Sequence, residues 1–379
     1  DGIMNSLLLI TIITFFLALE ICFAGTIVGS KGSILKARVV ANFSNPWSLA
    51  FIDNDWMLVS SKQGQLWLVS KNGEKVKVTG VPKVAIGGQG GLGDIVPHPN
   101  FLNNKLIYLS YVEAKGFLQP RGAVVIRGTL KGSRNPTLTN LERIWTQIPK
   151  TGGSGHFSHR IVFGPKGSAH EGKIFITSGD RQRFTVAQDW NKNLGKIIRL
   201  NEDGSVPLDN PFQDQGELAK SFWTLGHRNA LGIDFDSYGR LWSHEMGPWN
   251  GDEFNLILPG KNYGWPLVSE GKHYNGEEIP KHSTRPELNA PVIHWIPTIA
   301  PSGLFFYSGN EFPNWKGNAF LGGLKSKALI RVEVKGTRAK ESERFSWGQR
   351  VREVEEAPDG SIWILEDPPK GRLIELTSP

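Results

Sequence analysis

Residues 351–376 read VREVEEAPDGSIWILEDPPKGRLIEL, and this stretch decides the fold. The apolar segments Val351–Val354, Ile362–Leu365 and Leu373–Leu376 are separated by turns at Pro358-Asp359-Gly360 and Gly371. Turns of the Asp-Gly type join neighbouring antiparallel strands. The stretch therefore predicts a meander of short strands, with an aromatic residue near the start of the second one.

The same pattern occurs three more times, in segments that begin at Trp47, Arg160 and Leu231. Repeats of some tens of residues indicate an array of identical units. Short aromatic-marked strands without a long amphipathic helix are typical of a β-propeller, which hides its strand edges by closing on itself. About 345 residues are available, which divide into six blades of roughly 55 to 60 residues. We predict an all-β fold, a six-bladed β-propeller of four-stranded antiparallel blades, as a single domain over residues 36–379.

The N-terminal segment is expected to direct the chain out of the cytoplasm. Leu7–Leu19 is an unbroken apolar run, and small residues follow near Ala24. The run is shorter than the ~20 residues that span a bilayer. A signal peptide over residues 1–24 is the preferred interpretation, and an uncleaved membrane anchor is the alternative, since no Lys or Arg precedes the run. The expected location is periplasmic or secreted.

Composition excludes several classes of protein. The net charge of +7 is spread along the chain without a Lys/Arg block, so nucleic acid is not an expected partner. A single cysteine, Cys22, excludes intramolecular disulfides and a cysteine-based zinc site. The sequence Gly88–Gly93 formally matches a dinucleotide-binding fingerprint, but two prolines follow it where that site requires a helix.

His156 and Asp180 form a candidate acid–base pair. His156 lies in a glycine-rich loop that enters a strand, and Asp180 closes the next hairpin. A hairpin brings both ends to one rim, and a carboxylate beside an imidazole creates a general base. The alternative is a turn-capping aspartate and a solvent-facing histidine.

Two further groups suggest ligand binding. Arg350 and Arg352 alternate, so both face one side of a strand, while Glu353 and Glu355 face the other. Like charges on one face repel unless an anion lies between them, which makes a bound anion as plausible as a structural role. The loop at Gly247–Glu253 could offer carbonyl and carboxylate oxygens to calcium, although its spacing matches no EF-hand.

The motifs taken together resemble the soluble aldose sugar dehydrogenases of the glucose/sorbosone dehydrogenase family. The resemblance runs from about Val39 to Leu376 and rests on these segments: Pro46–Phe51, Gly88–Leu92, His156 with Arg160, Gly179-Asp180, Gly226–Asn229, His244–Pro248, Gly251–Ile257, Asn262–Pro266, Ala300–Gly303 and Arg350–Val354. Family members are six-bladed propellers that use pyrroloquinoline quinone (PQQ) and calcium. The resemblance thus implies a PQQ-dependent enzyme that oxidises aldoses at C1 to lactones.

The resemblance also implies residue roles. His156 corresponds to the base, Asp180 to its orienting carboxylate, and Arg228 to a residue that stabilises charge on the quinone. The remaining implied PQQ contacts are Gln89, Asn229, Thr298, Lys325, Arg350 and Arg352. The carbonyls of Gly247 and Pro248 are similar to ligands of the catalytic calcium. Glu253 and the Tyr263 carbonyl are similar to ligands of a structural calcium.

His159 and Met246 depart from the family pattern, which leaves the substrate range open. Two other functions remain possible at this stage. A calcium-dependent lactonase would not need converging arginines, and a non-catalytic sugar-binding propeller would not need His156, Asp180 and Arg228 together. The electron acceptor, and whether the protein is a monomer or a homodimer, are not determined by the sequence.

Overall fold

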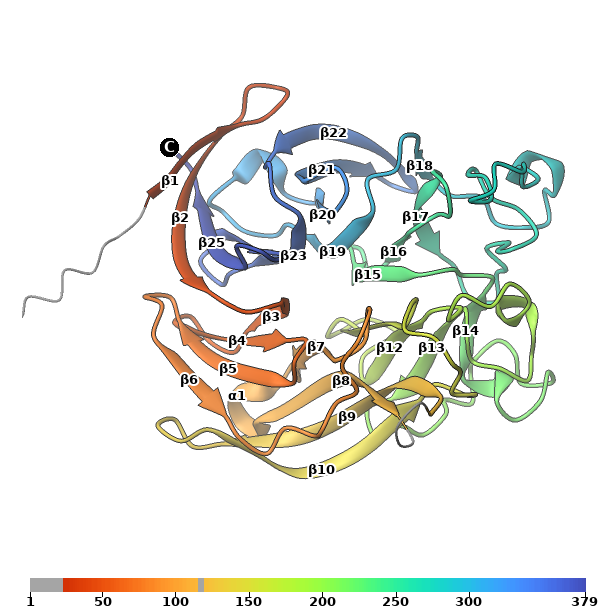
Figure 1. Cartoon of the computed structure of the whole chain (residues 1–379), viewed down its shortest axis with the longest axis horizontal. Coiled ribbons are helices and arrows are strands. Elements are labelled where there is room, and N and C mark those ends of the chain that lie inside the picture. Colours follow the sequence, from red (N-terminus) through yellow and green to blue (C-terminus); the bar gives the residue numbers. More distant parts are fainter. Residues whose placement is uncertain (1–22, 115–118) are drawn as a thin grey trace, which may run out of the picture.

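The computed structural model describes residues 23–114 and 119–379 and forms a closed ring of six antiparallel sheets (Figure 1). This confirms the predicted six-bladed β-propeller. Most of the predicted signal segment, residues 1–22, lies outside the described residues. In the part of the chain that is described, no helix is long and apolar enough to cross a membrane.

Each blade is a meander whose first strand lies innermost. The blades are, in order: β3 (Pro46–Phe51), β4 (Trp56–Ser61), β5 (Gln65–Ser70) and β6 (Lys75–Val78); β7 (Leu92–Pro97), β8 (Leu106–Ala114), β9 (Arg121–Lys131) and β10 (Thr137–Thr146); β11 (Ser158–Phe163), β12 (Lys173–Ser178), β13 (Lys196–Asn201) and β14 (Phe222–Leu225); β15 (Ala230–Phe235), β16 (Leu241–Glu245), β17 (Asp252–Ile257) and β18 (Ile293–Trp295); β19 (Pro301–Phe306), β20 (Ala319–Gly323), β21 (Ala328–Lys335) and β22 (Arg338–Ser346); and β23 (Val351–Glu356), β24 (Ile362–Glu366) and β25 (Arg372–Thr377). The short helices are α1 (Phe101–Asn104), η1 (Val186–Gln188), η2 (Ala219–Ser221), η3 (His282–Thr284) and η4 (Pro313–Trp315).

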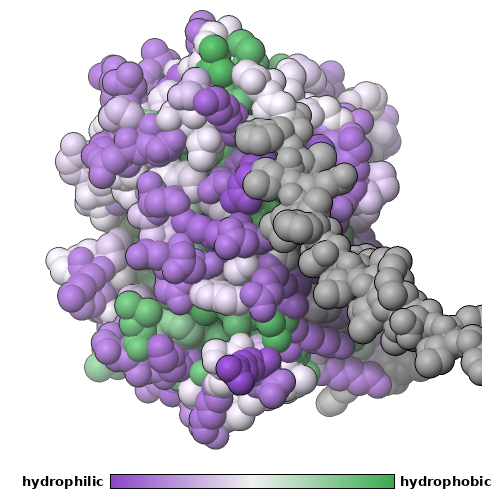
Figure 2. All heavy atoms as spheres, turned by 90° about the vertical axis from the view of Figure 1, so that its left-hand side faces the viewer, coloured by the Kyte–Doolittle hydropathy of each residue, from purple (hydrophilic) through white to green (hydrophobic). Residues whose placement is uncertain are grey.

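The ring closes by pairing the two ends of the described chain. Strand β2 (Ile34–Asn42) pairs antiparallel with β25 and so completes the blade that begins with β23. Strand β1 (Phe23–Val28) adds a fifth strand to this blade, ahead of the predicted domain start at residue 36. The surface around β1 and β2 is mostly hydrophilic, with small separate apolar areas (Figure 2).

The core consists of apolar layers between neighbouring blades. Six buried clusters each combine residues of two adjacent blades, as where Phe175 and Ile197 pack with Ile233 and Leu241. A blade therefore buries both of its faces, which explains why its strands read as short continuous apolar runs. The polar residues are left to the loops at the rims and to the strands that surround the central axis.

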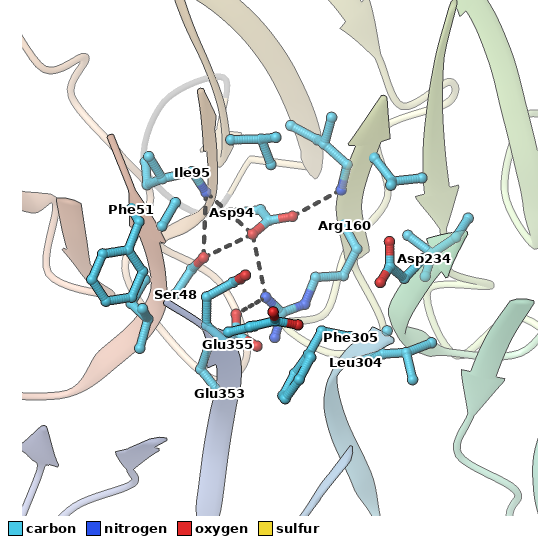
Figure 3. Close-up of a pocket in the computed structure, with 18 of the residues that line it drawn as sticks. Ser48, Phe51, Asp94, Ile95, Arg160, Asp234, Leu304, Phe305, Glu353 and Glu355 are labelled. Atoms are coloured by element: carbon cyan, nitrogen blue, oxygen red, sulfur yellow. Dashed lines mark hydrogen bonds and ion pairs between the residues drawn. The ribbon is translucent and has the colours of Figure 1, made fainter. Parts of the chain in front are cut away.

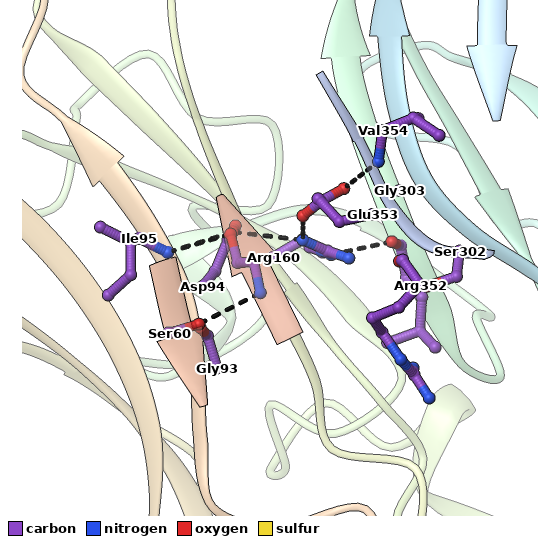
Figure 4. Close-up of polar contacts among 12 residues, drawn as sticks. Ser60, Gly93, Asp94, Ile95, Arg160, Ser302, Gly303, Arg352, Glu353 and Val354 are labelled. Carbon is purple, nitrogen blue, oxygen red and sulfur yellow. Dashed lines mark hydrogen bonds and ion pairs between the residues drawn. The ribbon is translucent and has the colours of Figure 1, made fainter. Parts of the chain in front are cut away.

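Arg160 on β11 joins four blades at the centre of the ring (Figure 4). Its Nη1 contacts Asp94 of β7 at 3.3 Å and also pairs with Glu353 of β23, while its Nε donates to the Leu231 carbonyl of β15 at 2.9 Å. Its guanidinium carbon lies 4.1 Å from the ring centroid of Trp47. The three charged side chains are buried, so this network ties inner strands together where no apolar layer can do so.

Arg160 lines a cavity of about 530 Å³ formed by the later residues of the inner strands (Figure 3). We call this cavity the acidic chamber, because Asp94, Asp234, Glu353 and Glu355 all border it. Burial raises the pKa of Asp234 to about 7 and that of Glu353 to about 7. The cavity that contains the predicted site residues is a different one, formed where the inner strands begin.

Candidate active site

The first residues of the inner strands surround a cavity of about 170 Å³, which we call the axial cavity. It is lined by Trp47, Lys62, Gln89, Phe157, Ser158, His159, Leu231, Met246, Ala300, Leu324, Arg350 and Arg352. Three of the predicted cofactor contacts, Gln89, Arg350 and Arg352, therefore line the same cavity. The cationic side chains of this lining are Lys62, Arg350 and Arg352, and they give the cavity a positive charge.

His156 and Asp180 meet as the hairpin geometry predicts. Nδ1 of His156 lies 2.7 Å from Oδ1 of Asp180, and both residues are buried. The carboxylate makes Nδ1 the protonated ring nitrogen, so Nε2 is the basic one. Trp265 donates its indole N–H to Asp180 Oδ2 at 2.8 Å, and Gln89 accepts the His156 backbone N–H at 2.8 Å.

The electrostatic surroundings keep the His156 imidazole neutral. Burial lowers its pKa, the hydrogen bond to Asp180 opposes that change, and the charge of Arg228 lowers the pKa further. An imidazole whose pKa lies below its ordinary value is unprotonated at neutral pH. It can therefore accept a proton there.

Arg228 and Asn229 follow β14 and border the same region. Arg228 donates through Nη1 to the carbonyls of Met246 (3.1 Å) and Gly247 (2.7 Å), and its Nε is buried without a hydrogen-bond partner. Asn229 is fully buried and accepts a hydrogen bond from Ser158 of the axial cavity at 3.0 Å. Arg228 is connected to the acid–base pair through its backbone, because its carbonyl accepts the Asp180 N–H at 2.8 Å.

Arg350 and Arg352 do face the same side, and the anion between them belongs to the protein. Asp367 accepts from Arg350 Nε at 2.9 Å and from Arg352 through Nε and Nη2 at 2.6 and 2.9 Å. Asp367 comes from the turn after β24, so of the two alternatives the structure shows a structural partner, and it lies outside the strand that carries Glu353 and Glu355. Both arginines still line the axial cavity.

Lys62 is a cavity residue that the sequence analysis missed. Its Nζ donates to the Gly88 carbonyl at 2.6 Å, and its pKa is lowered by burial and then by the nearby charge of Arg352. One carboxylate, Asp367, thus faces three cationic groups. Lys325, by contrast, is exposed on the turn between β20 and β21, next to Leu324 of the cavity wall.

The loop at Gly247 and Pro248 is held by a residue whose role was also missed. Asp252 accepts the Gly247 N–H at 2.9 Å through one oxygen. Its other oxygen accepts the Thr298 hydroxyl and the backbone N–H of Ala300 (2.8 Å). Thr298 is therefore bonded to a neighbouring carboxylate, and Asp252 fixes two of the loops at this end of the ring relative to each other.

The predicted calcium ligands Gly247, Pro248, Glu253 and Tyr263 all border one small cavity of about 10 Å³, which Arg228 also lines. Burial and then the charge of Glu245 raise the pKa of Glu253 well above its ordinary value, and Asn255 donates to it at 3.0 Å while its own Oδ1 is buried without a partner. The Tyr263 carbonyl lies 3.1 Å from His282 Nε2. The Glu253 carboxylate and the backbone carbonyls of this cavity are hard oxygen donors, which calcium prefers. Among the described residues, no three acidic, His or Cys side chains converge as a metal site.

The two departures from the family pattern both line the axial cavity. His159 stacks on Trp47 with ring centroids 5.1 Å apart, and its Nδ1 lies 2.6 Å from the Ser110 hydroxyl. Burial, with the charge of Arg160, lowers its pKa to about 3, so His159 is neutral. Met246 accepts the Asn229 amide at 3.8 Å through sulfur. Both side chains line the cavity as uncharged groups.

A second opening lies against Arg228. This outer pocket has a volume of about 390 Å³ and is lined by Phe184, Arg228, Pro248, Trp265, His273, Tyr274, Asn275 and Glu277. Phe184 and Tyr274 are largely exposed, and the Tyr274 hydroxyl accepts from Arg228 Nη2 at 3.2 Å. Trp265 belongs to this pocket and also holds Asp180, so the outer pocket borders the acid–base pair.

Fold and site together define a propeller enzyme with a histidine–carboxylate pair beside a cationic axial cavity. The chain belongs to the glucose/sorbosone dehydrogenase family, whose pattern it matches over residues 43–375. It is 35% identical over 374 residues to aldose sugar dehydrogenase YliI of Escherichia coli K12. This alignment covers 96% of this chain and 98% of the relative.

Two solved structures show the same architecture. The apo form of the soluble aldose sugar dehydrogenase from Escherichia coli superposes with a TM-score of 0.84 at 34% identity, covering 91% of this chain and all of that one. The PQQ-bound aldose sugar dehydrogenase from Streptomyces coelicolor gives a TM-score of 0.73 at 28% identity, with coverages of 90% and 98%.

Proposed function

We propose that this protein is a PQQ- and calcium-dependent dehydrogenase that oxidises the C1 hydroxyl of aldoses and yields the lactone. One observation carries the proposal. The His156–Asp180 pair is hydrogen-bonded to Gln89 of the axial cavity through one residue and to Trp265 of the outer pocket through the other. A base in this position contacts the walls of both a cofactor pocket and a substrate pocket.

The axial cavity suits a polyanionic cofactor. PQQ carries three carboxylates, and their desolvation requires cationic donors. Lys62, Arg350 and Arg352 supply these donors, and Asp367 neutralises only part of their charge. Gln89, Asn229 and Thr298 are the proposed polar contacts, and Lys325 would need to reach inward from its exposed turn. The relationship to a PQQ-bound aldose sugar dehydrogenase supports the assignment.

The residues present also suit calcium. The carbonyls of Gly247 and Pro248 would hold the catalytic ion, while Glu253, the Tyr263 carbonyl and the unpaired Asn255 Oδ1 would hold a structural one. When bound, calcium would polarise the acceptor as a Lewis acid. Bound calcium would then stabilise the ionised form of Glu253, whose pKa is raised when no ion is bound.

In the proposed reaction, His156 Nε2 takes the proton of the C1 hydroxyl, and Asp180 stabilises the imidazolium that forms. Bound PQQ would supply the two-electron acceptor for the hydride that leaves C1, so the substrate would lose one hydride to the cofactor and one proton to His156. The positive charge of Arg228 would offset negative charge that develops on the acceptor side. Phe184, Trp265 and Tyr274 provide an aromatic wall for the sugar.

Dye reduction tests this function. The chain is expressed in a host that lacks PQQ, PQQ and calcium are added, and a panel of aldoses is supplied. We expect reduction that requires PQQ and at least one aldose. Absence of reduction with every sugar, together with an unchanged PQQ absorption spectrum, would refute it. Hydrolysis of a sugar lactone without PQQ would support a lactonase instead.

We further propose that the enzyme acts in the periplasm or outside the cell, on the basis of the apolar N-terminal run. Fractionation of cells that express the full chain tests this location. Detection of the protein only in the cytoplasmic fraction would contradict it.

A further inference from the structure

Arg181 is a fully buried arginine whose hydrogen bonds all go to neutral oxygens. Its Nε donates to the Gly155 carbonyl at 2.9 Å, and its Nη2 donates to the Gly153 carbonyl at 2.8 Å. Its Nη1 donates to the Arg121 carbonyl at 2.6 Å and to the Thr151 hydroxyl at 3.1 Å. Burying a charge is unfavourable unless its hydrogen-bonding groups are satisfied. The hydrogen bonds of the charged Arg181 guanidinium fix the segment 151–155.

This segment leads directly into His156, and Arg181 contacts the residues on both sides of that histidine. The backbone N–H of Arg181 donates to the His156 carbonyl at 3.3 Å. Its guanidinium carbon lies 3.8 Å from the ring centroid of Phe157. Because Arg181 also follows Asp180 in sequence, one residue connects both members of the acid–base pair.

The backbone at this place is strained and needs external support. His156 has φ of 51°, Arg181 of 54° and Gln182 of 58°, all in the left-handed region that non-glycine residues rarely occupy. Such conformations persist only where the surroundings enforce them. The contacts of Arg181 with residues 153, 155, 156 and 157 provide that enforcement.

Arg181 also contributes to the electrostatic field at His156. The charged groups that face the imidazole are Asp180, Arg228 and Arg181. Asp180 raises the His156 pKa, whereas burial and the two arginines lower it. Removal of the Arg181 charge therefore moves this pKa upward.

We propose that Arg181 is a positioning residue for the base, which holds the loop of His156 in its strained conformation through its hydrogen bonds to that loop and its stacking on Phe157. The inference rests on the proposed role of His156. It concerns a residue that touches neither of the two site cavities.

The test compares Arg181→Met and Arg181→Lys with a matched control, Arg199→Met. Arg199 lies on β13, is equally buried, and its guanidinium carbon lies 4.8 Å from the Trp223 ring centroid; it donates to Asp209 and Asn210 in the loop after β13. Its loss removes a buried arginine from the same blade without touching the loop of His156. Both methionine variants are expected to lose thermal stability.

Displacement of a catalytic group by about 1 Å can reduce turnover by ~100-fold, so we expect Arg181→Met to lower kcat at least tenfold with KM changed less than about twofold. The acid limb of its kcat/KM profile should move to higher pH. Arg181→Lys should keep the wild-type pH profile and recover part of kcat, and Arg199→Met should keep both. Wild-type kcat and pH profile in folded Arg181→Met, or an equal loss of kcat in Arg199→Met, would overturn the proposal.

An NMR titration of the His156 imidazole provides a readout that does not depend on turnover. We expect its pKa to be higher in Arg181→Met than in the wild-type protein, and unchanged in Arg199→Met. If the wild-type protein oxidises no sugar, the proposed function fails, yet this titration still decides the claim about Arg181. An identical His156 titration in all three proteins would refute it.

Discussion

Replacement of Arg160 by methionine should destabilise the propeller by about 3–5 kcal/mol. Arg160 is 5% exposed and pairs with Asp94 and Glu353, which are each 5% exposed as well. Removal of one partner from a buried ion pair costs about this much, because a charge remains buried without compensation. Methionine retains the aliphatic part of the side chain but lacks the guanidinium that stacks on Trp47, so loss of this contact adds to the electrostatic loss.

The stability lost on replacement of Arg160 should depend on pH. Burial raises the pKa of Glu353 to about 7, and the Arg160 charge opposes this rise. A raised folded-state pKa means that Glu353 contributes stability fully below its unfolded pKa of about 4.5, and that this contribution is lost as pH rises through about 7. At about pH 5 Glu353 is protonated in the folded protein, so the cost of losing Arg160 should be smaller there than at pH 8.

Urea denaturation followed by tryptophan fluorescence measures these differences. Arg38→Met is the control, since the Arg38–Glu375 pair is more exposed than the Arg160 pairs (27% and 15% of the side chains) and so should cost less to remove. The double variant Arg160→Met with Glu353→Gln should recover part of the lost stability, because it removes one unpaired carboxyl. A loss below about 1 kcal/mol for Arg160→Met, or no recovery in the double variant, would refute the reasoning.

Three other variants address the site. His156→Asn should lower kcat by about 100-fold or more while PQQ still binds; wild-type turnover would remove His156 from the role of base. Arg350→Gln should weaken PQQ binding about tenfold in fluorescence titrations, since it removes one charge-assisted donor, and an unchanged Kd would exclude Arg350 from the cofactor site. Phe184→Ala should raise KM for aldoses several-fold with kcat nearly constant, because an exposed aromatic wall of the outer pocket is lost; equal KM values would show that the sugar binds elsewhere.

The sequence predicted those features that depend on short-range chain geometry. The turn-separated apolar segments around Ile362 and Leu373 became β24 and β25, since strand period and turn chemistry are local properties. The proximity of His156 and Asp180 was predictable because one hairpin, β11–β12, brings its two ends together. Arg350 and Arg352 share a face for the equally local reason that side chains alternate along a strand.

Only the tertiary structure decided which blades contribute to each cavity. Asp367 lies between the two arginines, and Trp265 reaches Asp180 from another blade, 85 positions away in the sequence. Lys62 lines the axial cavity from the first blade, whereas Arg350 and Arg352 line it from the last one. The contact between β2 and β25, which closes the ring, is likewise invisible in either segment alone. Such contacts depend on how six twisted sheets curve around one axis, and that curvature is set by the packing of apolar layers between blades and not by the residues of any one turn or strand.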